Sequence, residues 1–171
     1  MKQLAIINPE NVSNNEVEKY LTRNAARAVI FDENKLVSLL HVTSEKYYKL
    51  PGGGVEDLED FKKTLRRECR EEAGSEIDII MEIGSIIEYR KIFNLKQISY
   101  CYLAKIKGKK GIPNFTEEEL QKGFESVWLP YEEALEILSN NIATSFEGSS
   151  YIVPRDIIFL KEAKKYLDNL G

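Results

Sequence analysis

The sequence predicts an α/β or α+β fold built on a mixed β-sheet. Most of the chain consists of short apolar runs rich in β-forming residues, and three helical segments are inserted among them. A glycine-rich stretch within residues 50–74 leads directly into the first of these helices. We therefore expect the glycine turn and the helix behind it to lie against the sheet.

The N-terminal half supplies the first strands. Residues 4–7 form a short apolar run that predicts an edge strand, and residues 17–21 predict a helical turn. Residues 25–31 and 36–42 are apolar and β-rich, and the polar residues between them predict a hairpin.

The central helix has clear start and stop signals. Asp60 is well placed as the N-cap of a helix over residues 61–73, and Gly74 is typical of the residue that ends one. The three glycines at 52–54 predict a turn before it.

The C-terminal half continues the alternation. Residues 77–87 and 98–106 predict strands, and 88–97 is either a hairpin loop or a continuation of both. Residues 108–115 predict a loop, and Thr116 with Glu119 resembles a capping box. A strand over 124–129 and helices over 131–138 and 155–167 complete the prediction.

The composition suits one globular domain with a sizeable core: the chain has 171 residues, of which 43% are hydrophobic and 30% charged. A formal net charge of −4 argues against a nucleic-acid or membrane surface, although a small phosphorylated ligand is compatible with it. We find neither an apolar stretch of membrane-spanning length nor a secretory leader, so we expect a cytoplasmic protein.

The acids of the central helix are in an unusual position. Leu65, Cys69 and Ala73 form its apolar stripe, and the glutamates at 68, 71 and 72 border that stripe, where they repel one another at i,i+3 and i,i+4 spacings. A hard divalent cation such as Mg²⁺ would offset this repulsion. The alternative is an ordinary charged helix shoulder exposed to water.

The spacing of this stretch resembles the Nudix box, the signature of the Nudix hydrolase superfamily, which includes MutT-like proteins. Gly53 is followed by five residues, Glu59, seven residues and then the run from Arg67 to Gly74. Ser75 and Leu58 depart from the family pattern at positions that are not ligands. The resemblance implies an α/β/α sandwich with a central mixed sheet. Residues 24–139 would form the domain, 1–23 an N-terminal extension packed on it, and 140–171 a C-terminal helical extension of the same domain.

The resemblance also implies an activity. It is Mg²⁺-dependent hydrolysis, with Mn²⁺ as a second possible ion, of the pyrophosphate linkage of a nucleoside diphosphate joined to another group. That substrate class includes nucleoside triphosphates, nucleotide sugars and dinucleoside polyphosphates. A ligand-binding or regulatory domain with little hydrolysis is the alternative, and an isomerase of the isopentenyl diphosphate type has less support. The absence of a proline near Tyr89 mildly disfavours ADP-ribose. A homodimer is a further possibility.

Roles for single residues follow from the matching positions. Glu68, Glu71 and Glu72 would hold the metal, Glu59 would assist through water or a second ion, and Arg67 would orient a glutamate. Gly53 and Gly54 would leave room for phosphates. Arg27 and Lys49 could contact a base or a phosphate, although strand-end residues of this kind are often plain surface. The general base is either a box glutamate or one of Glu117, Glu118 and Glu119, which could equally be a solvated helical turn.

Overall fold

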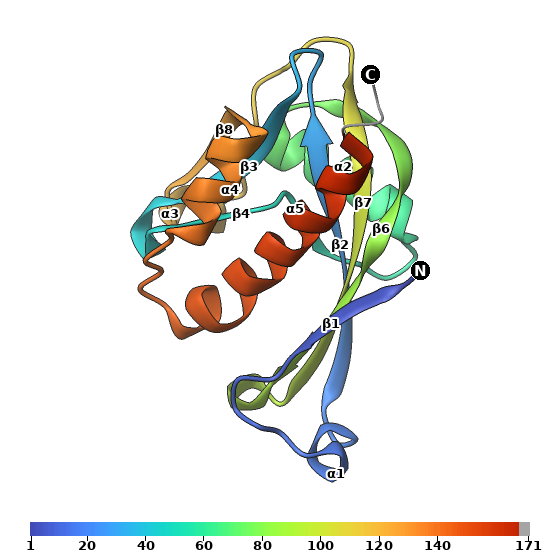
Figure 1. The fold of residues 1–171 in the computed structure, drawn as a ribbon, viewed down its shortest axis with the longest axis vertical. Coiled ribbons are helices and arrows are strands. Elements are labelled where there is room, and N and C mark those ends of the chain that lie inside the picture. The colour runs from blue at the N-terminus through green and yellow to red at the C-terminus, as the bar shows by residue number, and fades with distance from the viewer. Residues whose placement is uncertain (168–171) are drawn as a thin grey trace.

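The structure is a computed structural model that describes residues 1–167. These residues form one eight-stranded sheet with the order β1-β6-β7-β2-β3-β4, in which β5 pairs with β2 and β8 with β3 (Figure 1). The strands are β1 (Gln3–Ile7), β2 (Leu21–Phe31), β3 (Leu36–Val42), β4 (Tyr47–Lys49), β5 (Gly52–Gly54), β6 (Glu76–Arg90), β7 (Leu95–Lys107) and β8 (Phe124–Pro130). The pairs β1 with β6 and β2 with β7 are parallel and the others are antiparallel. The predicted mixed sheet is confirmed.

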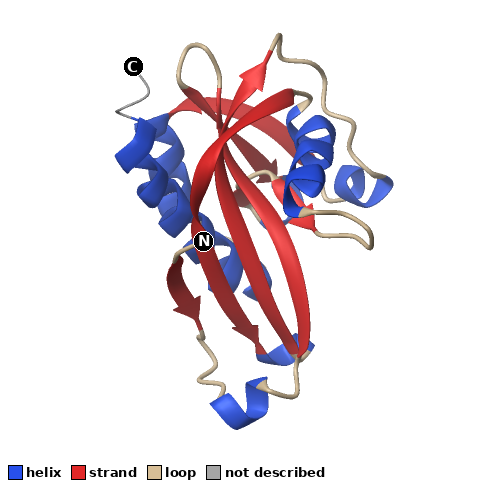
Figure 2. Cartoon of the chain, turned by 90° about the vertical axis from the view of Figure 1, so that its right-hand side faces the viewer, coloured by secondary structure: helices blue, strands red, loops and turns tan. Residues whose placement is uncertain are grey.

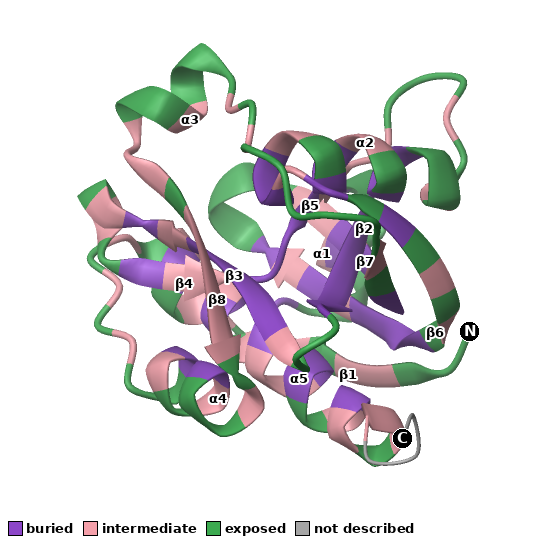
Figure 3. Ribbon diagram, turned by 90° about the horizontal axis from the view of Figure 1, so that it is seen from above, coloured by how far each residue is buried: buried purple, intermediate pink, exposed green. Residues whose placement is uncertain are grey.

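Helices cover both faces of the sheet. The helices of the described residues are α1 (Asn14–Val17), α2 (Phe61–Ala73), α3 (Glu117–Gln121), α4 (Tyr131–Ser139) and α5 (Val153–Leu167), with short helical turns at Thr43–Glu45, Lys91–Phe93 and Gly148–Ile152. Figure 3 shows α2 on one side of the sheet and α4 and α5 on the other, and Figure 2 shows the strands between helices. Within residues 1–167, each helix is too short or too polar to cross a membrane.

Strand β2 carries the two cores on its alternating faces. Ala26, Ala28 and Ile30 pack with the buried stripe of α2, as predicted for Leu65, Cys69 and Ala73. Val29 and Phe31 point to the opposite face and pack with α4 and α5. Because successive side chains of a strand point to opposite sides, one strand supports both helical layers.

The boundaries of α2 are those predicted. Asp60 accepts a hydrogen bond from the Lys63 backbone N–H at 2.7 Å, and Gly74 ends the helix with a φ of 61°. A left-handed residue at this position is typical of a helix C-terminus. The capping box of α3 is also present, with Thr116 and Glu119 bonded to each other's backbone N–H.

Two local predictions need correction, and of the two alternatives for residues 88–97 the structure shows the continuation of both strands. The helical turn predicted at residues 17–21 lies earlier, because Ser13 caps α1 and Leu21 already begins β2. The glycines at 52–54 form strand β5 rather than a turn, because they pair with Ala25 to Arg27 of β2. Residues 88–97 continue both strands almost completely, and a short helical turn at Lys91–Phe93 joins β6 to β7.

Candidate active site

The inner acids of α2 lie directly against strand β5. Glu72 is 1% exposed and its Oε2 accepts a hydrogen bond from the Gly52 N–H at 2.6 Å. A Cβ added at Gly53 would lie 2.1 Å from Oε1 of Glu68. The glycines are therefore required for the close approach of this strand to the two carboxylates.

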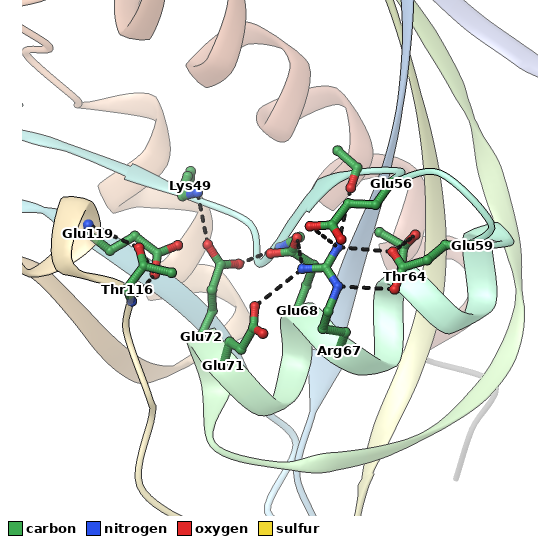
Figure 4. Close-up of polar contacts among 12 residues, drawn as sticks. Lys49, Glu56, Glu59, Thr64, Arg67, Glu68, Glu71, Glu72, Thr116 and Glu119 are labelled. Atoms are coloured by element: carbon green, nitrogen blue, oxygen red, sulfur yellow. Dashed lines mark hydrogen bonds and ion pairs between the residues drawn. The ribbon is translucent and has the colours of Figure 1, made fainter.

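Arg67 lies at the centre of the remaining acids. Its guanidinium donates to Glu59 at 3.1 and 3.2 Å, to Glu68 at 2.8 Å and to Glu71 at 3.3 Å. Figure 4 shows these carboxylates around Arg67, with Glu72 turned instead toward Lys49. The predicted orienting role of Arg67 agrees with this geometry, which joins three of the four predicted glutamates through one side chain.

The pKa values of these acids move in opposite directions. Burial raises the pKa of Glu68 and of Glu72 above the ordinary value, against the attraction of Arg67 for Glu68 and of Lys49 for Glu72. Glu59 differs, because hydrogen bonds from Arg67 and from the Thr64 hydroxyl lower its pKa to about 2. The inner pair is thus the part of the cluster that most needs positive charge.

A cleft of about 490 Å³ opens beside β5. Of the predicted site residues, it is lined by Arg27, Lys49, Gly53, Gly54, Glu68 and Glu72. Glu59, Arg67 and Glu71 do not line it; they lie behind or beside the inner pair, and the Glu71 side chain is 33% exposed. The predicted residues therefore divide into a cleft-lining group and a supporting group.

Lys49 is tied to the acids in this structure. Its Nζ lies 3.0 Å from Oε1 of Glu72, and the side chain is 13% exposed. The same ammonium stands over the Phe124 ring, 4.8 Å from its centre. Lys49 thus lies where the buried carboxylate and the cleft meet.

The donor set fits a divalent cation, although the acids are not gathered around one point. Within residues 1–167, no three acidic, histidine or cysteine side chains are close enough together to hold a metal ion as they stand. Arg67 and Lys49 bond the carboxylates that the metal would need. Carboxylate oxygens beside an open glycine backbone are nevertheless the ligands that Mg²⁺ prefers.

The candidate general bases differ in position. Glu118 and Glu119 line the cleft, whereas Glu117 does not. Glu119 accepts bonds from Thr116 in the capping box, and Glu118 lies 2.8 Å from the Lys122 ammonium. Both carboxylates therefore already have partners on their own helix.

Sequence reasoning missed a buried polar group on the α5 side of the cleft. Arg90, Gln97 and Arg155 line the cleft and are 1–3% exposed. Glu88 bonds Arg90 at 3.1 Å and Gln97 at 2.7 Å, and Asp156 accepts from the Leu50 N–H at 2.8 Å. The signal in the sequence was the alternation of side chains along a strand. Glu88 lies two residues after the core residue Ile86, and Gln97 lies four residues before the core residue Cys101, so both point to the same face as that core. Interpreting residues 88–97 as a possible loop concealed it.

Known proteins with similar folds agree with this architecture. The family model described as NUDIX domain matches residues 21–147. A MutT protein from Methanosarcina mazei Go1 is 17% identical with a TM-score of 0.60, covering 90% of this chain and 99% of that one. An ADP-ribose pyrophosphatase from Streptococcus suis 89-1591 is 17% identical with a TM-score of 0.53, covering 83% and 92%.

A third solved structure, the E. coli ORF135 protein, is 18% identical with a TM-score of 0.58 and covers 90% of this chain and 96% of that one. At these identities the likeness concerns the fold. A comparison with curated protein sequences finds no match.

Proposed function

Because the chain belongs to the Nudix hydrolase superfamily, we propose that it hydrolyses the pyrophosphate linkage of a nucleoside diphosphate joined to another group. The substrate class comprises nucleoside triphosphates, nucleotide sugars and dinucleoside polyphosphates. The observation that carries the proposal is the buried pair of carboxylates, Glu68 and Glu72, held against the glycine strand at the wall of the cleft.

Glu68, Glu71 and Glu72 would hold Mg²⁺, with Mn²⁺ as an alternative. Among residues 1–167, the ion pairs of these three carboxylates and of Glu56 and Glu59 are formed only with Arg67 and Lys49. When bound, a divalent ion supplies positive charge at the phosphoryl oxygens and makes a water molecule more acidic.

The chain's own residues would position the reactants. Arg67 holds Glu59, Glu68 and Glu71 in one arrangement, so that each carboxylate is oriented before substrate arrives. Arg27 and Lys49 present positive charge to the cleft, where they would bind the substrate phosphates. Gly53 and Gly54 leave space at the same wall.

The general base would be a glutamate at the cleft. Glu118 and Glu119 are the better placed of the three candidates on α3, since Glu117 does not line the cleft. To act as a base, Glu118 would have to give up its ion pair with Lys122. A box glutamate stays the alternative.

The activity can be tested directly. The purified chain would be incubated with Mg²⁺ and a panel of nucleoside triphosphates, dinucleoside polyphosphates, nucleotide sugars and ADP-ribose. We expect release of phosphate, pyrophosphate or a nucleoside monophosphate from at least one of them, and no release in excess EDTA. Binding of a compound without turnover would support the regulatory domain instead.

Glu71→Gln tests the metal assignment. Glu71 is the most exposed of the three proposed ligands, so its replacement should leave the fold intact. We expect turnover to fall by more than about 100-fold, beyond the loss typical of a residue that only supports a ligand. Glu133→Gln, an exposed change of the same kind on α4, is the matched control. Near-normal turnover of Glu71→Gln would contradict the assignment.

A further inference from the structure

The cleft has a second charged wall, formed by buried arginines. Arg27 projects from β2 onto the face covered by α5, in phase with Val29 and Phe31, and it is 8% exposed. Arg155 lies in the first turn of α5 and is 1% exposed. Both side chains line the cleft. Of the proposed metal ligands, Glu68 and Glu72 line the same cleft from α2, so the arginines add a second set of charges to it.

Arg155 has two carboxylates beside it, but not all of its N–H donors are used. Its Nε donates to Oδ1 of Asp156 at 2.7 Å, and its Nη1 lies 3.6 Å from Oε2 of Glu88. Its Nη1 and Nη2 atoms are buried and make no hydrogen bond with the described residues. One edge of the guanidinium is therefore held in place while the other donors stay unused.

The guanidinium of Arg27 has fewer partners than that of Arg155. Its Nε and Nη1 are buried without a hydrogen-bond partner in residues 1–167, and no described carboxylate forms an ion pair with it. Burial lowers the pKa of Arg27 to about 10, and repulsion from the charge of Arg155 acts in the same direction. Two guanidinium groups thus face one cleft and repel each other. A buried cation of this kind is costly, and an apolar side chain would suit a purely structural position better.

An anion between these arginines would remove that cost. The acids whose charge attracts Arg27 are Asp156, Glu72 and Glu68. Asp156 already accepts bonds from Arg155 and Leu50, and the two glutamates are the proposed metal ligands. The guanidinium fork matches the oxygens of a phosphate and can donate to two of them at once.

We propose that Arg27 and Arg155 form an anion subsite that takes a phosphoryl group of the substrate, apart from the phosphate bound at the glutamates of α2. This inference rests on the proposed hydrolysis, and it narrows the substrate class. A nucleotide with a chain of three or more phosphates fills both sites, whereas a nucleotide sugar offers a neutral sugar to the second. The subsite depends on α5, which lies outside the Nudix box.

The test uses the full chain in EDTA, so that binding is measured without metal. Thermal unfolding would be followed with and without inorganic pyrophosphate at constant ionic strength, set with sodium chloride. We expect pyrophosphate at saturating concentration to raise the Tm of the wild-type chain by at least about 2–4 °C. No rise would overturn the subsite.

Arg27→Met separates binding from a structural role. Without pyrophosphate, we expect this variant to have a Tm equal to or higher than that of the wild-type chain, because an unpaired buried charge is removed. With pyrophosphate, its Tm should not rise. Arg66→Met, which removes an exposed arginine on α2, should keep the full pyrophosphate effect. A lowered Tm of Arg27→Met together with an intact pyrophosphate effect would contradict the proposal.

Kinetics then test the substrate class. For any hydrolysed nucleoside triphosphate, Arg27→Met should raise KM at least about tenfold, and it should change KM for a nucleotide sugar much less. Equal effects on both substrates would overturn the narrowed class. Hydrolysis without pyrophosphate binding in EDTA would reject only the subsite, whereas pyrophosphate binding without hydrolysis of any substrate would reject only the proposed function.

Discussion

The absence of a side chain at Gly53 determines where the Glu68 carboxylate can lie. The space that its missing Cβ leaves is filled by the Glu68 carboxylate, whose Oε1 would be 2.1 Å from that atom. Since the conflicting atom is the end of a flexible side chain, the strand can tolerate an alanine only by displacing Glu68. A substitution here thus moves a proposed ligand without touching the helix that carries it.

We predict that Gly53→Ala keeps the fold but lowers the rate of hydrolysis at least about tenfold, because the new methyl group displaces the Glu68 carboxylate from its position. Turnover and Tm would be measured on the same preparation. Gly108→Asn is the control, since a Cβ there meets nothing within 4 Å and asparagine tolerates its positive φ. Wild-type turnover in Gly53→Ala would show that the position of Glu68 does not matter.

At the scale of elements, the hairpin between β2 and β3 depends on one buried acid. Asp32 is 3% exposed, and its Oδ1 accepts from the backbone N–H groups of Asn34 and Leu36 at 2.9 and 2.8 Å. Its Oδ2 lies 2.5 Å from the Lys110 ammonium. Burial acts to raise the pKa of Asp32, but the bonds from Lys110 and Leu36 outweigh it and hold the pKa below the ordinary 3.8.

The sign of the pH dependence follows. Because the folded state holds this carboxylate ionised more firmly than the unfolded chain does, its stabilisation is complete above about pH 3.8 and is lost as the pH falls through the lower folded pKa. We predict that Asp32→Asn lowers the free energy of unfolding by about 1 kcal/mol at pH 7, allowing for screening at the half-buried Lys110. The difference from wild type should shrink near pH 3.

Urea unfolding at the two pH values measures this difference. Glu33→Gln, an exposed change in the same turn, should be neutral at both. A difference that is equally large at pH 3 would mean that the charge of Asp32 contributes nothing.

The sequence predicts an element correctly when the residues that determine it are close to it in the chain. The bounds of α2 depend on Asp60 and Gly74, neighbours in sequence, and they were predicted correctly. Strand β5 depends on pairing with β2, more than twenty residues away in the chain, and its glycines suggested a turn. The acids of α2 were found because their spacing is a local pattern. Arg155 was missed because only the packing of α5 brings it to the cleft.

At the scale of the whole molecule, family membership and the sandwich architecture predicted from the sequence are confirmed, as is the expectation of an enzyme of this superfamily. The cytoplasmic location, the homodimer and the division into residues 1–23, 24–139 and 140–171 stay predictions. The last four residues of that C-terminal extension, 168–171, lie outside the described residues. The role of the extension can be tested, because its helix α5 supplies both core and cleft residues.

Helix α5 should unfold together with the rest of the domain. Phe159, Leu160 and Ala163 are completely buried in the core that α5 shares with β2 and β7, and Asp156 bonds the Leu50 N–H just before β5. Trp128, the only tryptophan, packs beside the other core, on the α2 side. Its fluorescence therefore reports the α2 side, whereas the far-ultraviolet helix signal sums helices on both sides of the sheet, α5 included. In one cooperative unit the two signals must change together.

We predict that Phe159→Ala lowers the free energy of unfolding by about 3–5 kcal/mol through the cavity it creates, and lowers the Tm by more than about 6 °C. Both signals should shift by the same amount, since loss of packing under α5 destabilises the whole sheet. Phe93→Ala, at a half-exposed position between β6 and β7, should change stability by less than about 0.5 kcal/mol. If the helix signal fell early while the tryptophan transition kept its wild-type midpoint, the C-terminal extension would be a separate folding unit. Arg155 would then be held at the cleft by a helix that can detach.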